Sequence, residues 1–162
     1  MIVNDIDTIP AREADRELCE QIVRAAYYEM VIREMGGWDE KQHRIYMEEG
    51  WRRQPPEVIR YRGEPIGTVR VYHDEHGIEI SQFCILPAYQ GRGIGTQMLS
   101  RILAEADASG KDTRLSVLHS NPAKRLYERH GFRVIGQDET FYYMERKPAK
   151  DPTGQKTRNN EI

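Results

Sequence analysis

Residues 84–96 read Cys-Ile-Leu-Pro-Ala-Tyr-Gln-Gly-Arg-Gly-Ile-Gly-Thr, so that an apolar run ends in a turn and three alternating glycines open a helical pattern. Glycine adopts backbone angles that other residues avoid, and it lets the main chain approach a ligand closely. Free N–H groups and the helix dipole at a helix start attract anions such as a pyrophosphate. Taken alone, the stretch is as compatible with a plain turn as with an anion site.

Two familiar phosphate-binding motifs do not fit this spacing. A P-loop needs a lysine after its second glycine, and no lysine follows Gly95. The dinucleotide fingerprint Gly-x-Gly-x-x-Gly needs a wider gap than the one between Gly93 and Gly95. The stretch does match Gln/Arg-x-x-Gly-x-Gly/Ala, through Gln90, Gly93 and Gly95.

A second landmark lies downstream, where Asn121 is followed by Leu-Tyr-Glu at 126–128 and by Gly-Phe at 131–132. With these two motifs, separated by one expected helix and one expected strand, the chain resembles the GNAT superfamily of acetyl-CoA-dependent N-acetyltransferases. The resemblance covers about residues 8–147, most strongly 78–135. It implies an acyltransferase that moves the acetyl group of acetyl-CoA directly to a primary amine of a small molecule or protein.

The resemblance also implies which residues hold the cofactor. The end of the third strand would bind the pantetheine arm through its backbone, and a main-chain N–H there would stabilise the oxyanion. These strand residues are Phe83, Cys84 and Ile85. The turn and helix start would hold the pyrophosphate with Gln90, Gly91, Arg92, Gly93, Ile94, Gly95 and Thr96. Asn121 would contact the arm of the cofactor.

Tyr127 matches the tyrosine that, in many members of the family, protonates the departing coenzyme A thiolate. Many members place this tyrosine seven positions after the asparagine, whereas here the offset from Asn121 is six. The departure weakens the assignment of Asn121 more than that of Tyr127. The alternative for Tyr127 is a packing role under Phe132.

Transfer to an amine also requires that the amine lose a proton. A lysine-like amine, with a pKa near 10.4, costs about 4.6 kcal/mol to present in its neutral form at pH 7. We expect Glu79 to be the general base, because strand alternation places it on one face with Phe83 and Ile85. It also precedes Gln90 by eleven residues, as the base glutamate does in the histone-acetylating branch of the family. The alternatives are a water relay, another carboxylate, or a merely solvated Glu79.

Other reactive side chains have plainer interpretations. Cys84 is expected to be a small buried hydrophobe rather than a nucleophile, since the family transfers the acetyl group directly. No His, Cys, Asp or Glu set has metal-ligand spacing, so we expect no metal. Four aromatic residues lie where the family builds its acceptor pocket, although their helical spacing is equally typical of a core: Tyr27, Tyr28, Trp38 and Trp51.

These residues must be positioned by an α/β fold. Apolar spacing and capping residues predict helices from Asp15 to Gly36, from Asp39 to about Gly50, over 93–109 and over 122–130. Strands are predicted at 58–61, 66–72, 78–86, 115–118, 132–135 and 140–144. The expected fold is GNAT-like: a mixed, mostly antiparallel sheet with a central parallel β-α-β crossover and flanking helices.

Composition limits the remaining possibilities. The chain has 162 residues, 38% of them hydrophobic, and a formal net charge of -2, which suits one globular domain over 1–147. Residues 148–162 contain two prolines and no aromatic residue, so a disordered tail is expected. The near-neutral charge and the lack of a long apolar run argue against nucleic-acid and membrane partners. No secretory signal is visible at the start of the sequence, and a cytoplasmic location is expected.

Charge is unevenly distributed along the sequence. Residues 1–40 carry 4 basic and 10 acidic side chains, and residues 87–133 carry 8 basic and 4 acidic. The basic section contains the proposed cofactor site, which gives a hypothesis of electrostatic steering. A non-catalytic acyl-CoA-binding sensor or interaction module on the same fold stays open as the alternative function. Acceptor identity and oligomeric state also stay open, although homodimers are frequent in the family.

Overall fold

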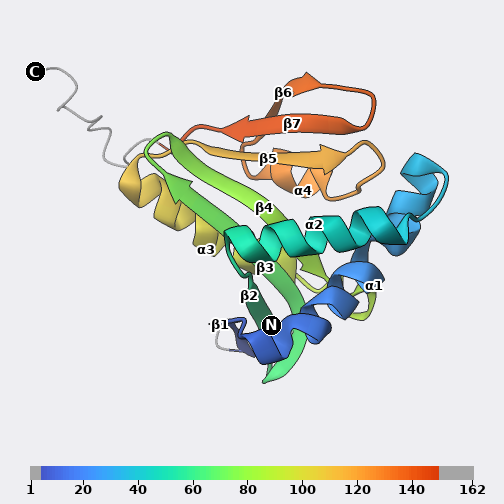
Figure 1. Ribbon diagram of the computed structural model, residues 1–162. Coiled ribbons are helices and arrows are strands. Elements are labelled where there is room, and N and C mark those ends of the chain that lie inside the picture. The colour runs from blue at the N-terminus through green and yellow to red at the C-terminus, as the bar shows by residue number, and fades with distance from the viewer. Residues whose placement is uncertain (1–4, 150–162) are drawn as a thin grey trace, which may run out of the picture.

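The computed structural model describes residues 5–149, in which one mixed sheet has the strand order β1-β2-β3-β4-β5-β7-β6 (Figure 1). The strands are β1 Ile6–Pro10, β2 Glu57–Tyr61, β3 Glu64–Asp74, β4 Gly77–Ile85, β5 Thr113–Leu118, β6 Arg133–Gln137 and β7 Phe141–Arg146. Neighbouring strands are antiparallel except β4 and β5, which are parallel. This is the mixed, mostly antiparallel sheet with a parallel crossover that the sequence predicts.

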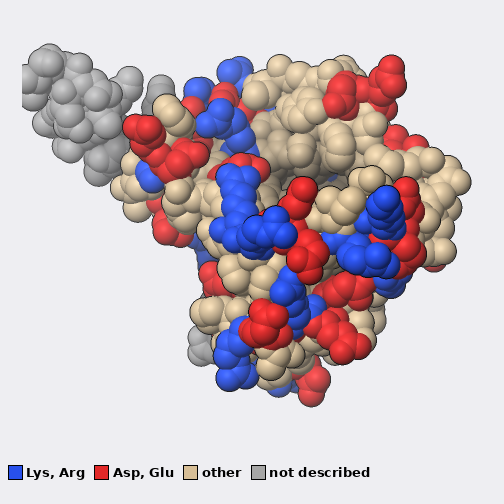
Figure 2. Space-filling view, in the orientation of Figure 1, with Lys and Arg blue, Asp and Glu red and all other residues tan. Residues whose placement is uncertain are grey.

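Helices cover both faces of the sheet (Figure 1). They are α1 Arg16–Met35, α2 Glu40–Arg53, α3 Ile94–Ser109 and α4 Lys124–Arg129, with short 3-10 turns at Glu13–Asp15 and Pro87–Tyr89. α1 and α2 lie over one face, here called the α1 face, and α3 and α4 lie over the other, the α3 face. Figure 2 shows the α1 face, where charged side chains of both signs are interspersed over the two helices.

The helix boundaries follow the capping signals. Gly36 ends α1 in the left-handed region, with φ 80°, where glycine carries no steric penalty. The Asp39 side chain accepts hydrogen bonds from the backbone N–H groups of Lys41 and Gln42 at the start of α2. α2 then continues to Arg53, beyond the end predicted near Gly50.

The expectation that the first strand begins at residue 58 was wrong, because β1 precedes α1. This five-residue strand pairs with β2 at the edge of the sheet and buries Ile6. Its apolar residues, Ile6 and Ile9, are three positions apart, so the segment lacks the alternation that marks a strand. Pairing with β2 therefore decides its conformation.

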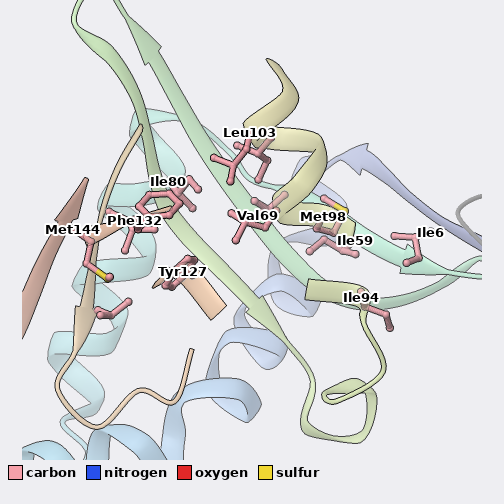
Figure 3. Close-up of a cluster of buried hydrophobic side chains, with 14 of the residues drawn as sticks. Ile6, Ile59, Val69, Ile80, Ile94, Met98, Leu103, Tyr127, Phe132 and Met144 are labelled. Carbon is pink, nitrogen blue, oxygen red and sulfur yellow. The ribbon is translucent and has the colours of Figure 1, made fainter. Parts of the chain in front are cut away.

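The main core lies on the α3 face (Figure 3). α3 buries six side chains against the sheet: Ile94, Met98, Leu99, Ile102, Leu103 and Ala106. At the other end of this core, Tyr127, Phe132 and Met144 pack together behind β5 and β7. This apolar layer fixes α3 and α4, the helices that carry the glycine turn and Tyr127.

β4 and β5 separate soon after they meet. They pair only at Ile78 with Thr113 and at Glu79 with Arg114, although both strands continue beyond these positions. The sheet therefore opens between the carboxyl ends of its two parallel strands, where α/β proteins commonly bind ligands.

Within residues 5–149, no helix is both long and apolar enough to cross a membrane. The tail predicted to be disordered at 148–162 lies outside the described residues, apart from Pro148 and Ala149.

Candidate active site

A cavity of about 290 Å³ lies at the opening between β4 and β5. Its walls come from α1, the end of β4, the turn after β4, the start of α3 and the segment that leads into α4. Eight predicted site residues meet there: Phe83, Cys84, Ile85, Gln90, Gly91, Gly95, Asn121 and Tyr127. Helices from both faces of the sheet therefore line the cavity.

The end of β4 presents backbone hydrogen-bonding groups to this cavity. Leu86 N–H donates to Ile66 O at 2.8 Å, and alternate residues of β4 then bond to β3. Phe83 and Ile85 consequently turn their backbone groups toward the open edge. Tyr27 Oη donates to Phe83 O at 3.1 Å, and Gln90 Nε2 donates to Ile85 O at 2.9 Å.

The glycine turn is shaped by its backbone angles. Gly91 and Gly93 have φ of 77° and 83°, and a Cβ at either position would meet nothing within 4 Å. Backbone angle, rather than crowding by protein atoms, therefore requires glycine here, and the space above the turn is left for a ligand.

The start of α3 offers free donors. Gln97 N–H makes the first bond to Gly93 O, and no side chain caps the helix, so the N–H groups of Ile94, Gly95 and Thr96 have no intrahelical acceptor. The Ile94 side chain is buried in the core, so only the backbone of this residue can contact a ligand.

The side chains of Gln90 and Arg92 both contact the protein, and their contacts with a pyrophosphate stay predictions. The Gln90 side chain ties the turn back onto β4, and the exposed Arg92 guanidinium lies over the Tyr89 ring at 5.0 Å. Of the predicted cofactor residues, Arg92, Gly93, Ile94 and Thr96 do not line the cavity itself.

Tyr127 is 5% exposed and lines the cavity from α4. Its ring packs edge-on against Phe132 at 5.6 Å, so the packing role and the position at the site coexist. Burial raises the pKa of Tyr127 well above its ordinary value, with a smaller contribution from Cys84. The phenol therefore remains protonated, and able to donate a hydrogen bond, throughout the physiological pH range.

Cys84 is a buried thiol, not an activated one. Its Sγ lies 3.2 Å from Thr68 Oγ1, and the residue packs beside Ile22 and Val23 of α1. Burial raises the pKa of Cys84 to about 11. A thiol with such a pKa is protonated at neutral pH, which agrees with the interpretation of Cys84 as a small hydrophobe.

Asn121 shapes the turn into α4. Its side-chain Oδ1 accepts a hydrogen bond from Ala123 N–H at 2.8 Å. Asn121 also lines the cavity, so the side chain has a structural bond as well as a place at the site. Its contact with a cofactor stays a prediction.

The alternation argument for Glu79 was wrong, because β4 contains a bulge. Gln82 faces Arg70 and Ile80 faces Val71, which leaves Ser81 without an opposite residue and reverses the alternation beyond it. Ile80 and Phe83 consequently pack into the same cluster. Glu79 belongs instead to the α1 face.

Contacts of Glu79 agree with that placement. Its carboxylate is 50% exposed and lies 3.8 Å from Arg53 Nη2, and Arg53 also covers Tyr72, the residue opposite Glu79. Glu79 lines an open groove with Ser116 and Tyr143, apart from the cavity. The role of Glu79 as a base stays a prediction that now requires a relay.

The aromatic candidates divide between two places. Tyr27 lines the cavity. Tyr28 and Trp38 stack at 5.2 Å, and Arg16 lies 5.2 Å from the centre of the Trp51 ring, so these three rings pack around α1 and α2. Several apolar wall residues were not foreseen, since their spacing resembles that of a core: Ala26, Met30, Tyr89, Pro122, Ala123 and Leu126.

The described part of the chain contains no evident metal-binding group. Among residues 5–149, no group of three or more His, Cys, Asp or Glu side chains could hold a metal ion.

The fold and the cavity together define an α/β protein whose mixed sheet opens beside a glycine-rich helix start. A family model described as the acetyltransferase (GNAT) family matches residues 20–132, and the chain belongs to this family. The resemblance read from the sequence is thereby confirmed, and the expected enzyme class, an acyltransferase, is that of the family.

Known relatives agree with this membership. The chain is similar to the [ribosomal protein bS18]-alanine N-acetyltransferase of Haemophilus influenzae, with 37% identity over 59 residues. That alignment covers 36% of this chain and 40% of the relative, so it spans less than half of either protein.

Solved structures share the fold. The PaiA N-acetyltransferase of Thermoplasma acidophilum, in complex with coenzyme A, has a TM-score of 0.68 at 17% identity, over 88% of this chain and 98% of that one. The ribosomal-protein-S18-alanine N-acetyltransferase of Escherichia coli has a TM-score of 0.67 at 16% identity, over 90% and 96% of the two chains.

Proposed function

We propose that this protein transfers the acetyl group of acetyl-CoA directly to a primary amine. The observation that carries the proposal is the cavity at the opening between β4 and β5, where free backbone groups, a glycine turn and a buried tyrosine meet. Residues from helices on both sheet faces line this cavity.

The residues present fit acetyl-CoA. The free N–H groups at the start of α3 suit its pyrophosphate. The backbone N–H groups of Phe83 and Ile85 point to the open edge and suit carbonyl oxygens of its pantetheine arm, whereas the carbonyls of these residues already accept bonds from Tyr27 and Gln90. When bound, acetyl-CoA supplies an activated acyl group and a thiolate leaving group. A backbone N–H at this edge stabilises negative charge on the carbonyl oxygen.

Tyr127 acts on the leaving sulfur. Its raised pKa lies above the value near 8.5 of an ordinary thiol, so complete transfer of the phenol proton to a thiolate is unfavourable. We therefore assign to Tyr127 a hydrogen bond that stabilises the developing charge on sulfur. The amine nitrogen forms its bond to the acetyl carbon as the carbon–sulfur bond breaks.

The amine proton leaves toward the α1 face. Glu79 lies on this face but does not line the cavity, so it accepts the proton through a water relay. The products are an amide, protonated Glu79 and the coenzyme A thiolate; Glu79 returns its proton to solvent, and the released thiolate takes one up to give the thiol.

The acceptor is a small-molecule amine or a protein amine. The relative that acts on the alanine of ribosomal protein bS18 shares only part of the chain, so a peptide with an N-terminal alanine is one candidate among several. A panel should compare such a peptide with the same peptide N-terminally blocked, an internal lysine peptide, a polyamine and free amino acids.

The deciding experiment measures free-thiol release from acetyl-CoA with each amine, beside acetyl-CoA binding by calorimetry. We expect saturable binding and amine-dependent thiol release, with mass spectrometry showing the acetylated acceptor. Saturable binding without thiol release for any amine would instead favour the non-catalytic acyl-CoA sensor.

A further inference from the structure

The two walls of the cavity are not held together by the sheet. Beyond Glu79 and Arg114, β4 and β5 no longer pair. One wall is the end of β4, and the other runs from Asn121 to Tyr127 in α4, directly after Ser120. Contacts outside the sheet must therefore fix their separation.

Helix α1 contacts both walls. Tyr27 Oη donates to Phe83 O on the β4 wall at 3.1 Å, and Glu34 Oε1 accepts at 2.7 Å from the N–H of Ser120, the residue before the opposite wall. The two side chains are seven residues apart, about 10 Å along the helix and on the same side of it. Met30 lies between them and lines the cavity. Figure 1 shows the far half of α1 extending toward the carboxyl end of β5.

The turn that Glu34 holds has backbone hydrogen bonds of its own, from His119 N–H to Thr140 O at 3.0 Å and from Asn121 N–H to Leu118 O at 2.9 Å, but neither of these reaches α1 or β4. Within the described structure, the buried His119 Nε2 and Ser120 Oγ atoms have no hydrogen-bond partner. Glu34 is partly buried and bonds to a backbone N–H as a carboxylate acceptor, which is a strong class of hydrogen bond. This bond ties α1 to the segment that carries Asn121 and Tyr127.

We propose that Glu34 is a positioning residue which, together with Tyr27, sets the separation of the two walls of the cofactor cavity. The inference rests on the proposed function for the identity of the ligand. When Glu34 is replaced by a side chain that cannot accept a hydrogen bond, the wall that carries Asn121 and Tyr127 moves relative to β4. Acetyl-CoA then loses contacts on one side.

A rival role for Glu34 uses its charge rather than its hydrogen bond, for example in holding the ammonium form of an acceptor. Glu34→Gln separates the two roles, because the amide keeps an oxygen acceptor at the same place and removes the charge. Glu34→Ala removes both. Glu29→Ala is the matched control, since Glu29 is an exposed glutamate on the same helix.

Calorimetry of acetyl-CoA binding to the full chain is the test. We expect E34A to raise the Kd about tenfold and E34Q to raise it less than about twofold. E29A should leave the Kd unchanged. In the acetylation assay, the E34A effect should fall on the KM for acetyl-CoA, and E34Q should restore it. An E34Q variant as weak as E34A would overturn the proposal, as would an unaltered Kd in E34A.

A second variant tests the link between the two contacts even if E34A folds poorly. Tyr27→Phe removes only the hydroxyl that holds the β4 wall, and we expect it to raise the Kd about threefold. In the Y27F/E34Q variant, the Kd should rise only by the factor that Y27F causes by itself. In the Y27F/E34A variant, the Kd should rise by less than the product of the two single-variant factors. If the two factors simply multiplied, Tyr27 and Glu34 would act independently, which would contradict their joint role in setting the separation of the walls.

Failure of the inference is distinguishable from failure of the proposed function. A wild-type chain that does not bind acetyl-CoA would overturn both. A wild-type chain that binds it, with E34A binding equally well, would overturn only the role of Glu34.

Discussion

Helices α2 and α3 lie on opposite faces of the same sheet and are held by different forces. α3 buries six side chains in the main core, whereas α2 buries none. α2 is attached through polar contacts: Glu40 with Arg24, Glu48 with Arg16, and the carbonyl of Gln54 with Arg70. α3 is thus fixed by apolar burial and α2 largely by hydrogen bonds and ion pairs, while α1, on the same face as α2, buries Cys19, Ile22 and Val23.

This difference has consequences for motion. Exposed ion pairs contribute little to stability and weaken with salt, whereas apolar burial does not depend on the geometry of a few atoms. A helix without buried side chains is expected to open more readily than one in the core. We therefore expect α2, which contributes no residue to the cavity, to open more readily than α3, which carries the glycine turn.

The largest effect should follow from a cavity in the α3 core. Leu99 is fully buried, and Leu99→Ala should lower the free energy of unfolding by about 3 kcal/mol. Met47→Ala is the matched change on α2, where the side chain is only partly buried, and should cost about 1 kcal/mol. Urea denaturation measures both values. Equal losses would contradict the difference between the faces.

Of the polar contacts on the α1 face, we expect those of Arg70 to contribute most to the free energy of unfolding. Arg70 is 2% exposed and donates to two neutral acceptors, Gln54 O at 2.6 Å and Gln82 Oε1 at 3.2 Å. Arg70→Met keeps much of the volume but leaves the carbonyl at the end of α2 without its donor. We expect a loss of about 2 kcal/mol in urea denaturation.

Arg70→Lys is the control for this prediction. Lysine retains the charge but has fewer hydrogen-bond donors and a different shape. Arg70→Lys should therefore lower the free energy of unfolding by less than Arg70→Met does. If Arg70→Met were as stable as the wild type, then α2 would not depend on this contact.

The difference between the faces also explains what the sequence could predict. The α3 core was foreseen because Ile94, Met98 and Ile102 repeat at helical spacing and face one sheet. The glycine turn was foreseen for a similar reason, since the backbone angles of Gly91 and Gly93 are local properties. Local patterns therefore predicted the cofactor side of the site well.

The α1 face depended on contacts that no local pattern encodes. The bulge at Ser81 follows from the register of β3 against β4, and it moved Glu79 to the other face. The bond of Tyr27 to Phe83 O joins residues 56 positions apart. A polar residue such as Arg70 reads as exposed in the sequence, because its burial requires α2 to dock over it.

Tyr127→Phe probes the chemistry contributed from the α3 face. The ring keeps its packing against Phe132 and loses only the hydroxyl, so cofactor affinity should stay within about twofold. We expect kcat to fall about tenfold, equivalent to one hydrogen bond to the developing thiolate. Turnover and calorimetry on the same preparation provide the measurement. Unchanged turnover would remove Tyr127 from the mechanism.

Glu79→Gln probes the corresponding contribution from the α1 face. A base that acts through a relay is partly replaceable by solvent, so kcat/KM at neutral pH should fall only about fivefold. The acid limb of the pH–rate profile should disappear, because glutamine does not titrate. An unaltered profile would contradict the assignment of Glu79.

The smallest effect concerns an ion pair at the far end of α3. Arg146 donates two hydrogen bonds to the Asp107 carboxylate, at 2.8 and 3.1 Å, and the Ala149 N–H donates a third. These bonds lower the pKa of Asp107, with those from Arg146 contributing most. The stability that they contribute is therefore complete above the unfolded pKa near 3.9 and is lost as the pH falls through the lower, folded value.

Asp107→Asn should thus cost about 1 kcal/mol at pH 7, and the difference from the wild type should shrink below about pH 4. The matched change on the α1 face is Glu40→Gln, which removes an exposed partner of Arg24 and should leave the urea midpoint unchanged. Denaturation at pH 7 and pH 3 measures both variants. If Glu40→Gln were the costlier change, the ion pairs of α2 would carry stability that exposed pairs do not ordinarily supply, and α2 would be as firmly fixed as α3.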